Sequence, residues 1–314
     1  CWSGSDLFSK IGCCGEKDKT AHLKMVVAVG IVMGLHAAYM IVFHHVSVTW
    51  DVIWTYLPVS LLYILSMTLG YVGLRYIELS ISSPICNSSG ALVAVLCLCT
   101  GALSDYNGPQ KAVILCAVGL VCLGVVGLGV VEAREDDDLR RRRQEHANRK
   151  YAKSWLAICL PVAYCLLDAA GTFADNRVIE TLTAQAFDSG RFATLDECTK
   201  QVAASANCAY ELTFLFAAVV CFVYVVLIRR DRLIPKKEAP KYLGAVCETA
   251  GQFAYIYAIA DTEHLAMSAP IISSYCAASV LWSRLFLKEK LSWKHYAMIA
   301  LVVVGIAIMG VFDV

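Results

Sequence analysis

The sequence YVGLRYIELSISSPICNSSG (residues 71–90) opens a stretch that occurs again, in diverged form, as YAIADTEHLAMSAPIISSYC (residues 257–276). A gapless shift of 186 places aligns Tyr71–Val125 with Tyr257–Val311. Proline and glycine occupy special backbone positions, so their coincidence is a stronger sign of duplication than shared apolar composition. The aligned pairs include Tyr71 with Tyr257, Leu79 with Leu265, Pro84 with Pro270, Gly119 with Gly305 and Gly124 with Gly310.

The composition indicates a polytopic membrane protein. Hydrophobic residues make up 58% of the chain, charged residues 17%, and the mean hydropathy is +0.60, values outside the range of soluble domains. A spanning helix needs about 20 mostly apolar residues. On that criterion we expect nine complete spans, at residues 22–44, 53–76, 82–104, 110–131, 154–174, 207–229, 241–261, 265–287 and 292–312. The short segment before them, from Cys1 to Lys10, is expected to end a tenth helix that begins upstream.

The positive charges predict the topology. All of the 27 Lys and Arg residues except Lys111, Arg177, Arg191 and Lys200 fall in loops after odd-numbered helices, counting the truncated helix as the first. Cytoplasmic loops carry the excess of Lys and Arg, so these loops are predicted to be cytoplasmic.

Corresponding loops of the two copies differ in basic charge, as a repeat of five helices that enters the membrane in opposite senses requires. The predicted fold is therefore an all-α membrane protein, a ten-helix bundle of two inverted five-helix repeats. We expect a first repeat at residues 1–131, a charged cytoplasmic linker at 132–153 and a second repeat at 154–314, with an outside loop at 175–206.

Polar residues at helical spacing predict a wet cavity between the repeats. Tyr63 and Ser66, three residues apart, share one helix face, and Gln252 and Tyr255 share a face of another helix. The alternative is that these polar side chains hydrogen-bond between helices and do not line a cavity. Polarity and repeat register together suggest twelve substrate-binding residues, which are Trp2, Ser5, Tyr63, Ser66, Tyr71, Asn87, Ser88, Tyr164, Gln252, Tyr255, Ser273 and Ser274.

Acidic residues at membrane depth are costly and usually face a partner or a wet cavity. Glu248 and Asp168 are the candidates for coupling transport to a gradient, the alternative being protonated carboxyls that donate hydrogen bonds. The spacing of Asp6 and Lys10, one turn apart, suits a local ion pair, the alternative being a functional role for Asp6. Glu211 is expected near a membrane edge, where its cost is small.

Of the 15 cysteines, most lie in spans and act as small apolar residues. Cys198 and Cys208 fall at the predicted outside loop, where cysteines can be oxidised. We expect either a disulfide between them or two free thiols. The spacing of the cysteines gives no metal pattern, and no nucleotide or hydrolase motif occurs. We therefore expect no cofactor and no metal.

Several segments resemble the EamA-type branch of the drug/metabolite transporter superfamily. They are Trp2–Ser5, residues 269–274 (APIISS) and residues 285–293 (LFLKEKLSW), the last followed by a helix that contains glycine. The resemblance covers essentially the whole chain. It implies a central cavity, alternating access, and substrates such as amino acid derivatives, nucleobases and sugars, with Glu289 as a residue of a cytoplasmic helix connection.

We therefore predict that the chain is a secondary active transporter, a permease that moves a small polar metabolite across the plasma membrane. In a bacterium this would be the inner membrane. The alternative is a membrane-embedded enzyme or binding protein on the same scaffold. The expected partners are the lipid bilayer, a small-molecule substrate, and a coupling proton or exchanged solute. No nucleic acid partner and no enzymatic activity are expected.

Overall fold

The computed structural model describes residues 1–14, 18–100, 107–133, 155–190, 192–260, 272, 275–289 and 291–311. Within these ranges every regular element is helical, as the composition predicts. The helices of the first half are α1 (Trp2–Cys13), α2 (Ala21–Phe43), α3 (Trp50–Gly73), α4 (Leu79–Cys86), α5 (Ser89–Cys99) and α6 (Gly108–Ala133). Those of the second half are α8 (Trp155–Asp188), α9 (Leu195–Val223), α10 (Pro235–Ile259), α12 (Cys276–Trp282) and α13 (Trp293–Val311). One π-helical turn extends α9 over Tyr224–Ile228, and another extends α12 over Ser283–Leu287.

Six helical segments among the described residues are long and apolar enough to cross a membrane. They are Ala21–Phe43, Trp50–Gly73, Leu79–Cys99, Gly108–Leu128, Ile158–Asp188 and Leu195–Ile228. The remaining three predicted spans coincide with α10, with α12 and its π-helical turn, and with α13. Two of these are shorter apolar helices, Cys276–Leu287 and Trp293–Met309.

The bundle carries apolar side chains outward and polar side chains inward. Leu35, Phe216 and Leu123 are 68%, 71% and 64% exposed, whereas Ser60 and Glu211 are fully buried. In water this distribution would be unfavourable, but lipid is as apolar as the exposed side chains. The outer surface is therefore suited to contact with hydrocarbon.

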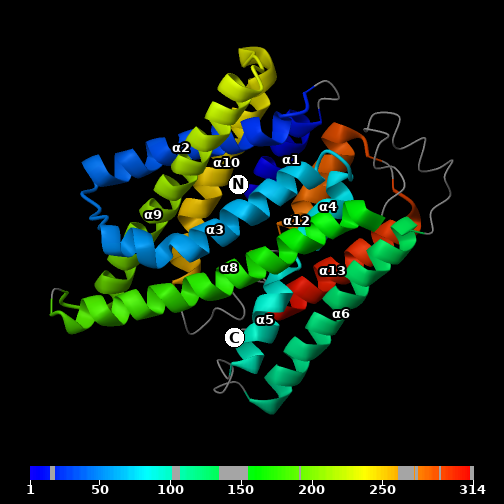
Figure 1. The fold of residues 1–314 in the computed structure, drawn as a ribbon. Coiled ribbons are helices and arrows are strands. Elements are labelled where there is room, and N and C mark those ends of the chain that lie inside the picture. Colours follow the sequence, from blue (N-terminus) through cyan, green and yellow to red (C-terminus); the bar gives the residue numbers. More distant parts are fainter. Residues whose placement is uncertain are drawn as a thin grey trace.

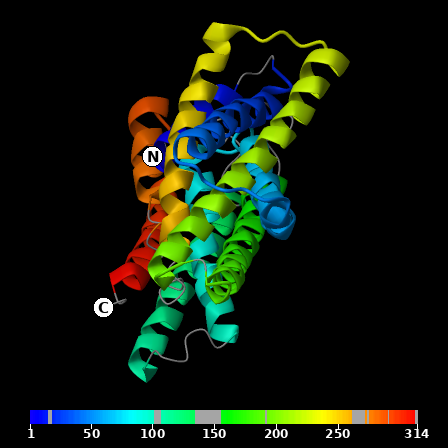
Figure 2. The same cartoon turned by 90° about the vertical axis from the view of Figure 1, so that its left-hand side faces the viewer.

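Helices of the two halves pack in matching pairs. α6 packs along α13, side by side in Figure 1, and α2 packs along α9. α3 packs on α8 and α9, whereas α10, its counterpart under the 186-residue shift, packs on α1 and α2. Figure 2 shows the connection at residues 229–234 that joins α9 to α10 at one end of the bundle.

The predicted span at 82–104 is interrupted. α4 ends at Cys86 and α5 begins at Ser89, with Asn87 and Ser88 between them. Pro84 has no backbone N–H to donate. At the break two side chains donate to carbonyls of the preceding turn: the Ser88 hydroxyl to the Pro84 carbonyl at 2.8 Å, and the Asn87 amide to the Ser83 carbonyl at 2.9 Å.

The predicted outside loop at 175–206 is wrong in its extent. α8 continues through Asp188, α9 already begins at Leu195, and only a short turn joins them. Thr194 caps the second helix by accepting a hydrogen bond from the Glu197 N–H, a pairing typical of a helix start. At about 1.5 Å per residue, the 34-residue α8 spans about 51 Å, well beyond the hydrocarbon core. Hydropathy indicated where the apolar part of α8 ends, near residue 174, and not where the helix itself ends.

The proposed Cys198–Cys208 disulfide is also wrong. Both residues lie on α9, and both are buried without a disulfide. Ten residues of helix separate them by about 15 Å, whereas a disulfide requires Cα atoms within about 7 Å. The Cys198 thiol instead donates to the Thr183 carbonyl across the α8–α9 turn at 3.5 Å.

Gly30 sets the closest approach between α2 and α9, and its substitution provides a test of this packing. A Cβ at Gly30 would lie 2.6 Å from the Phe214 carbonyl oxygen and 2.4 Å from the Ala218 Cβ. We expect Gly30→Ala to lower the melting temperature of the purified protein, because overpacking costs about 1–3 kcal/mol. Gly119→Ala is the matched control, because a Cβ there meets nothing within 4 Å. Equal melting temperatures for the two variants would contradict this packing.

Candidate functional site

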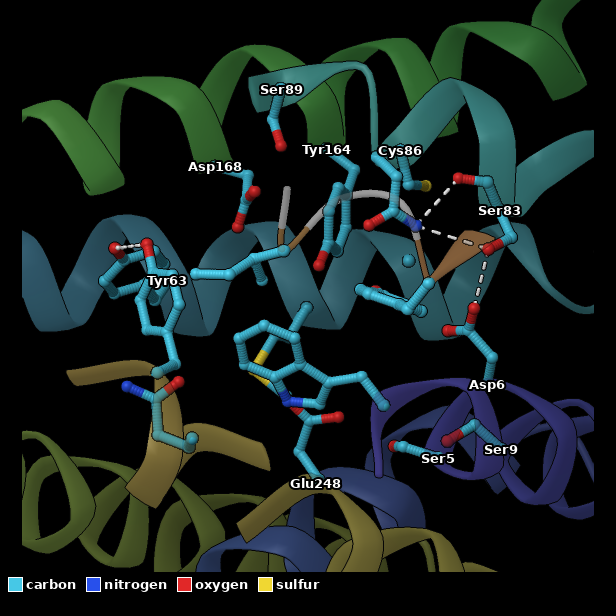
Figure 3. A pocket seen from close by; sticks show the side chains of 18 of the residues that line it. Ser5, Asp6, Ser9, Tyr63, Ser83, Cys86, Ser89, Tyr164, Asp168 and Glu248 are labelled. Atoms are coloured by element: carbon cyan, nitrogen blue, oxygen red, sulfur yellow. Dashed lines mark hydrogen bonds between the residues drawn. The ribbon is translucent and has the colours of Figure 1, made fainter. Parts of the chain in front are cut away.

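A cavity lies between the two halves of the bundle (Figure 3). About 100 Å³ of it is open to the centres of water-sized molecules, and one water needs roughly 10–15 Å³ on this measure. The cavity therefore has room for several waters or for one small solute. Its walls come from α1, α3, α4, α5, α8, α9 and α10, together with Ile272 and Tyr275 before α12.

Eight of the twelve residues selected for polarity and repeat register line this cavity. They are Trp2, Ser5, Tyr63, Tyr71, Asn87, Tyr164, Gln252 and Tyr255. Ser273 and Ser274 lie outside the described residues. That the lining residues bind substrate stays a prediction.

Ser66 and Ser88 are buried but do not line the cavity. The Ser66 hydroxyl donates to the Tyr63 carbonyl at 2.8 Å, and the Ser88 hydroxyl donates to the Pro84 carbonyl within its own segment. A serine hydroxyl that donates to a carbonyl of the preceding helical turn has used its one donor, so it offers little to a ligand. The sequence pattern could not distinguish this role from cavity lining.

Hydroxyl-bearing side chains form a connected network along one wall. The Tyr63 and Tyr255 hydroxyl oxygens are 3.0 Å apart, and the Thr172 hydroxyl lies 2.8 Å from Tyr255. The Trp2 ring packs against Tyr255 and Tyr275, with centroids 5.1 Å and 5.6 Å away. This wall combines aromatic faces with oxygen atoms that can accept hydrogen bonds.

Asp6 connects two helices and does not bind Lys10. Its Oδ2 atom accepts a hydrogen bond from the Ser83 hydroxyl of α4 at 2.7 Å (Figure 3) and another from the Ser279 hydroxyl of α12 at 2.7 Å. The expected local ion pair is wrong, because the Lys10 ammonium donates instead to the carbonyls of Leu74 and Ile77 at 2.7 Å and 2.5 Å. Asp6 is thereby free to face the cavity that it lines.

The two coupling candidates both line the cavity. Asp168 projects from α8, where it faces the Ser89 hydroxyl at the start of α5 (Figure 3). Glu248 projects from α10, beside Ser5 of α1, and lies within electrostatic reach of both Asp6 and Asp168. Three carboxyls from three helices therefore share one cavity.

Glu211 lies inside the bundle; that it is near a membrane edge stays a prediction. Because α9 begins at Leu195, Glu211 lies well within that helix and is fully buried. Its carboxyl oxygens lie 2.8 Å and 2.9 Å from the His36 Nδ1 atom, and the Asn207 amide donates to it at 3.0 Å. His36 is thus a hydrogen-bonded residue of the α2–α9 interface, as is more usual for a single intramembrane histidine.

Sequence reasoning missed Asp175 by placing it at the start of a loop. Asp175 is fully buried in α8, where it accepts hydrogen bonds from the hydroxyls of Tyr56 and of Tyr63, the latter at 3.2 Å. Its spacing from Thr172 and Asp168, on the same side of one helix, is the signal that could have revealed it.

Polar contacts between chain segments lie at one end of the cavity, beside its lining residues Leu74 and Leu79. The Glu289 carboxyl accepts hydrogen bonds from the backbone N–H groups of Leu79 and Ser80, both at 3.0 Å, and from the Ser80 hydroxyl at 2.6 Å. A carboxylate is favourable there because unpaired N–H groups mark the start of α4. Glu289 is thus a connecting residue that ties the α12–α13 connection to α4, and the Lys10 contacts lie at the neighbouring α3–α4 turn.

Comparisons with known proteins agree with this architecture. Residues 201–311 match the model of the EamA-like transporter family, which belongs to the drug/metabolite transporter superfamily. The resemblance predicted from the sequence is confirmed by this match. No curated protein matches the chain. A solved structure, titled only as the crystal structure of a protein, is similar at 11% identity with a TM-score of 0.52, over 98% of this chain and 93% of its own. At that identity the likeness concerns the fold alone.

Proposed function

Because residues 201–311 match the EamA-like transporter family, we propose that the chain is a secondary active transporter, a permease that moves a small polar solute across the plasma membrane. The observation that carries the proposal is the cavity between the two halves, which buries hydroxyl, amide and carboxyl groups inside a bundle with an apolar outer surface. Polar groups at membrane depth are expensive, so a wet cavity is their usual surrounding.

The proposal includes two inverted five-helix repeats, residues 1–131 and 154–314, on either side of a linker at 132–153. Packing of α3 on α8 has its counterpart in packing of α10 on α1, and packing of α3 on α9 has its counterpart in packing of α10 on α2. Such matched packing of corresponding helices is expected when two copies are related by a pseudo-twofold axis. Residues 134–153 of the linker lie outside the described residues.

Alternating access is supported by the kind of contact found at one end of the cavity. There Lys10 and Glu289 make hydrogen bonds to backbone groups near the start of α4. Water can replace such bonds at little net cost, whereas opening an apolar contact exposes hydrophobic surface. By the distribution of Lys and Arg this is the cytoplasmic end, and its opening would expose the cavity to the cytosol.

We further propose that a titrating carboxyl couples transport to a proton gradient, with Glu248 as the first candidate and Asp168 as the second. Both reach the cavity from the second half, Glu248 from α10 and Asp168 from α8. The same fold could hold a membrane-embedded enzyme or a binding protein. Transport is favoured because the matching family consists of transporters.

The proposal is tested by counterflow in proteoliposomes that contain the purified chain. Vesicles are loaded with pools of unlabelled metabolites, and entry of trace labelled members of each pool is measured against protein-free vesicles. We expect at least one pool to drive uptake above the protein-free level. Uptake at the protein-free level for every pool, with correctly folded protein in the vesicles, would contradict transport of small metabolites.

A further inference from the structure

The charge of the cavity is unusually one-sided. Asp6, Asp168 and Glu248 line it from α1, α8 and α10, and none of the described residues that line it is a Lys, Arg or His. A charge inside a protein bundle is retained when it is paired or hydrogen-bonded. The Asp6 carboxyl already receives two hydroxyl donors, but no described cation lines the cavity beside any of the three carboxyls. The missing partner is positive charge.

We infer that the cavity binds a small organic cation with at least two ammonium groups, an inference that names the substrate class of the transporter proposed above. The three carboxyls project from three separate helices around the cavity (Figure 3). Among the described residues no three His, Cys, Asp or Glu side chains converge closely enough to hold a metal ion. An extended ion with charges at separate points fits this arrangement better than a point charge does.

Unsatisfied polar atoms in the wall point independently to a ligand. Within the part of the chain that the structure describes, the Tyr71 hydroxyl and the Gln252 amide nitrogen have no hydrogen-bond partner. Both residues line the cavity, and each is only 6% exposed. A buried polar group without a partner costs about 1–3 kcal/mol. The Tyr71 oxygen can accept from an ammonium group, and a Gln amide can rotate to present its oxygen.

The aromatic wall supports the same class of ligand. Trp2, Tyr255 and Tyr275 pack together at the cavity, and the faces of such rings attract ammonium groups by about 0.5–2 kcal/mol. Zwitterions and anions fit poorly, because their carboxylate or phosphate finds no basic partner among these residues. The inference thus narrows the substrate range expected from the sequence to diamines and longer oligoamines.

Binding to the purified chain in detergent tests the inference without requiring transport. The probes are radiolabelled 1,4-diaminobutane and 1,8-diaminooctane, measured by equilibrium dialysis. The competitors are 1-aminobutane, 1,4-butanediol, 4-aminobutanoate and Mg²⁺. We expect a diamine to bind, the monoamine to compete about tenfold or more weakly because one charge pair is lost, and the diol, the zwitterion and Mg²⁺ not to compete. The inference is overturned if neither diamine binds, or if the diol, the zwitterion or Mg²⁺ competes as well as the diamine itself.

Variants locate the binding in this cavity. Asp6→Asn, Asp168→Asn and Glu248→Gln should each raise the Kd of the diamine roughly tenfold or more, since each removes one charge partner. Glu180→Gln is the matched control, because Glu180 is an exposed acidic residue on α8, the helix that carries Asp168. Unchanged Kd values in all three folded cavity variants would overturn the assignment, and if none of them folds, the competitor panel on the native chain decides alone.

The outcomes separate this inference from the proposed function. Diamine binding without counterflow of any pool would support a cation site and contradict transport. Counterflow of neutral or anionic solutes without diamine binding would support transport and contradict the cation site.

Discussion

Replacing Glu248 with Gln is expected to abolish the accumulation of substrate against its gradient in proteoliposomes, leaving internal and external concentrations equal. Gln preserves the shape of the side chain and its hydrogen bonds to the α1 side of the cavity, but it cannot release or take up a proton. Exchange at saturating substrate should persist, because exchange needs no net proton movement. The measurement is uptake driven by an imposed pH gradient, compared with counterflow in the same vesicles.

Glu180→Gln serves as the control for this prediction, because it removes an exposed carboxyl from α8 without touching the cavity. Should Glu248→Gln still concentrate its substrate with an unchanged pH profile, Glu248 is not the coupling group. Asp168→Asn is then the variant to examine, because Asp168 is the other coupling candidate in the same cavity.

Replacing Asp175 with Ala is expected to lower the stability of the bundle. The change removes the acceptor shared by the Tyr56 and Tyr63 hydroxyls, and Tyr56 and Asp175 are both fully buried. The Tyr56 hydroxyl is left without this partner, and a buried polar group without a partner costs about 1–3 kcal/mol. The Tyr63 hydroxyl keeps a neighbour, because the Tyr255 hydroxyl lies 3.0 Å away. The melting temperature and the monodispersity of the protein in detergent would report it.

Two comparisons isolate this effect. Asp175→Asn keeps an acceptor oxygen and should be much less damaging than Asp175→Ala. Asp196→Ala removes a carboxyl that is 75% exposed and paired only with Lys200 at the surface, where an ion pair contributes about 0–1 kcal/mol. If Asp175→Ala and Asp196→Ala melt alike, the Tyr56–Asp175–Tyr63 network does not hold the bundle together.

Local sequence features predicted much of the bundle. The span at 82–104 followed from its apolar length, although its interruption at Asn87 and Ser88 was not predicted. Gln252 and Tyr255 followed from helical periodicity, since side chains three or four residues apart share a face. Tyr71 followed from the repeat, which aligns it with Tyr257.

Features that depend on distant partners could not be predicted. Hydropathy ended the sixth predicted helix near Asp175, because a carboxylate after an apolar run resembles a membrane boundary, yet the hydroxyls of Tyr56 and Tyr63 allow that carboxyl to be buried. Asp6 was assigned to Lys10 by spacing alone, whereas Ser83 and Ser279, its partners, are far away in the sequence. Periodicity gives the face of a helix but not the neighbour that the face meets.

The central claim is that substrate crosses the membrane through the cavity between the two halves. Counterflow of the metabolite pools tests this claim most directly. It is measured in parallel for the native chain and for a triple variant with Asp6→Asn, Asp168→Asn and Glu248→Gln. We predict that the native chain exchanges at least one cationic amine and that the folded triple variant exchanges none. Exchange by the folded triple variant at the native rate would contradict the account.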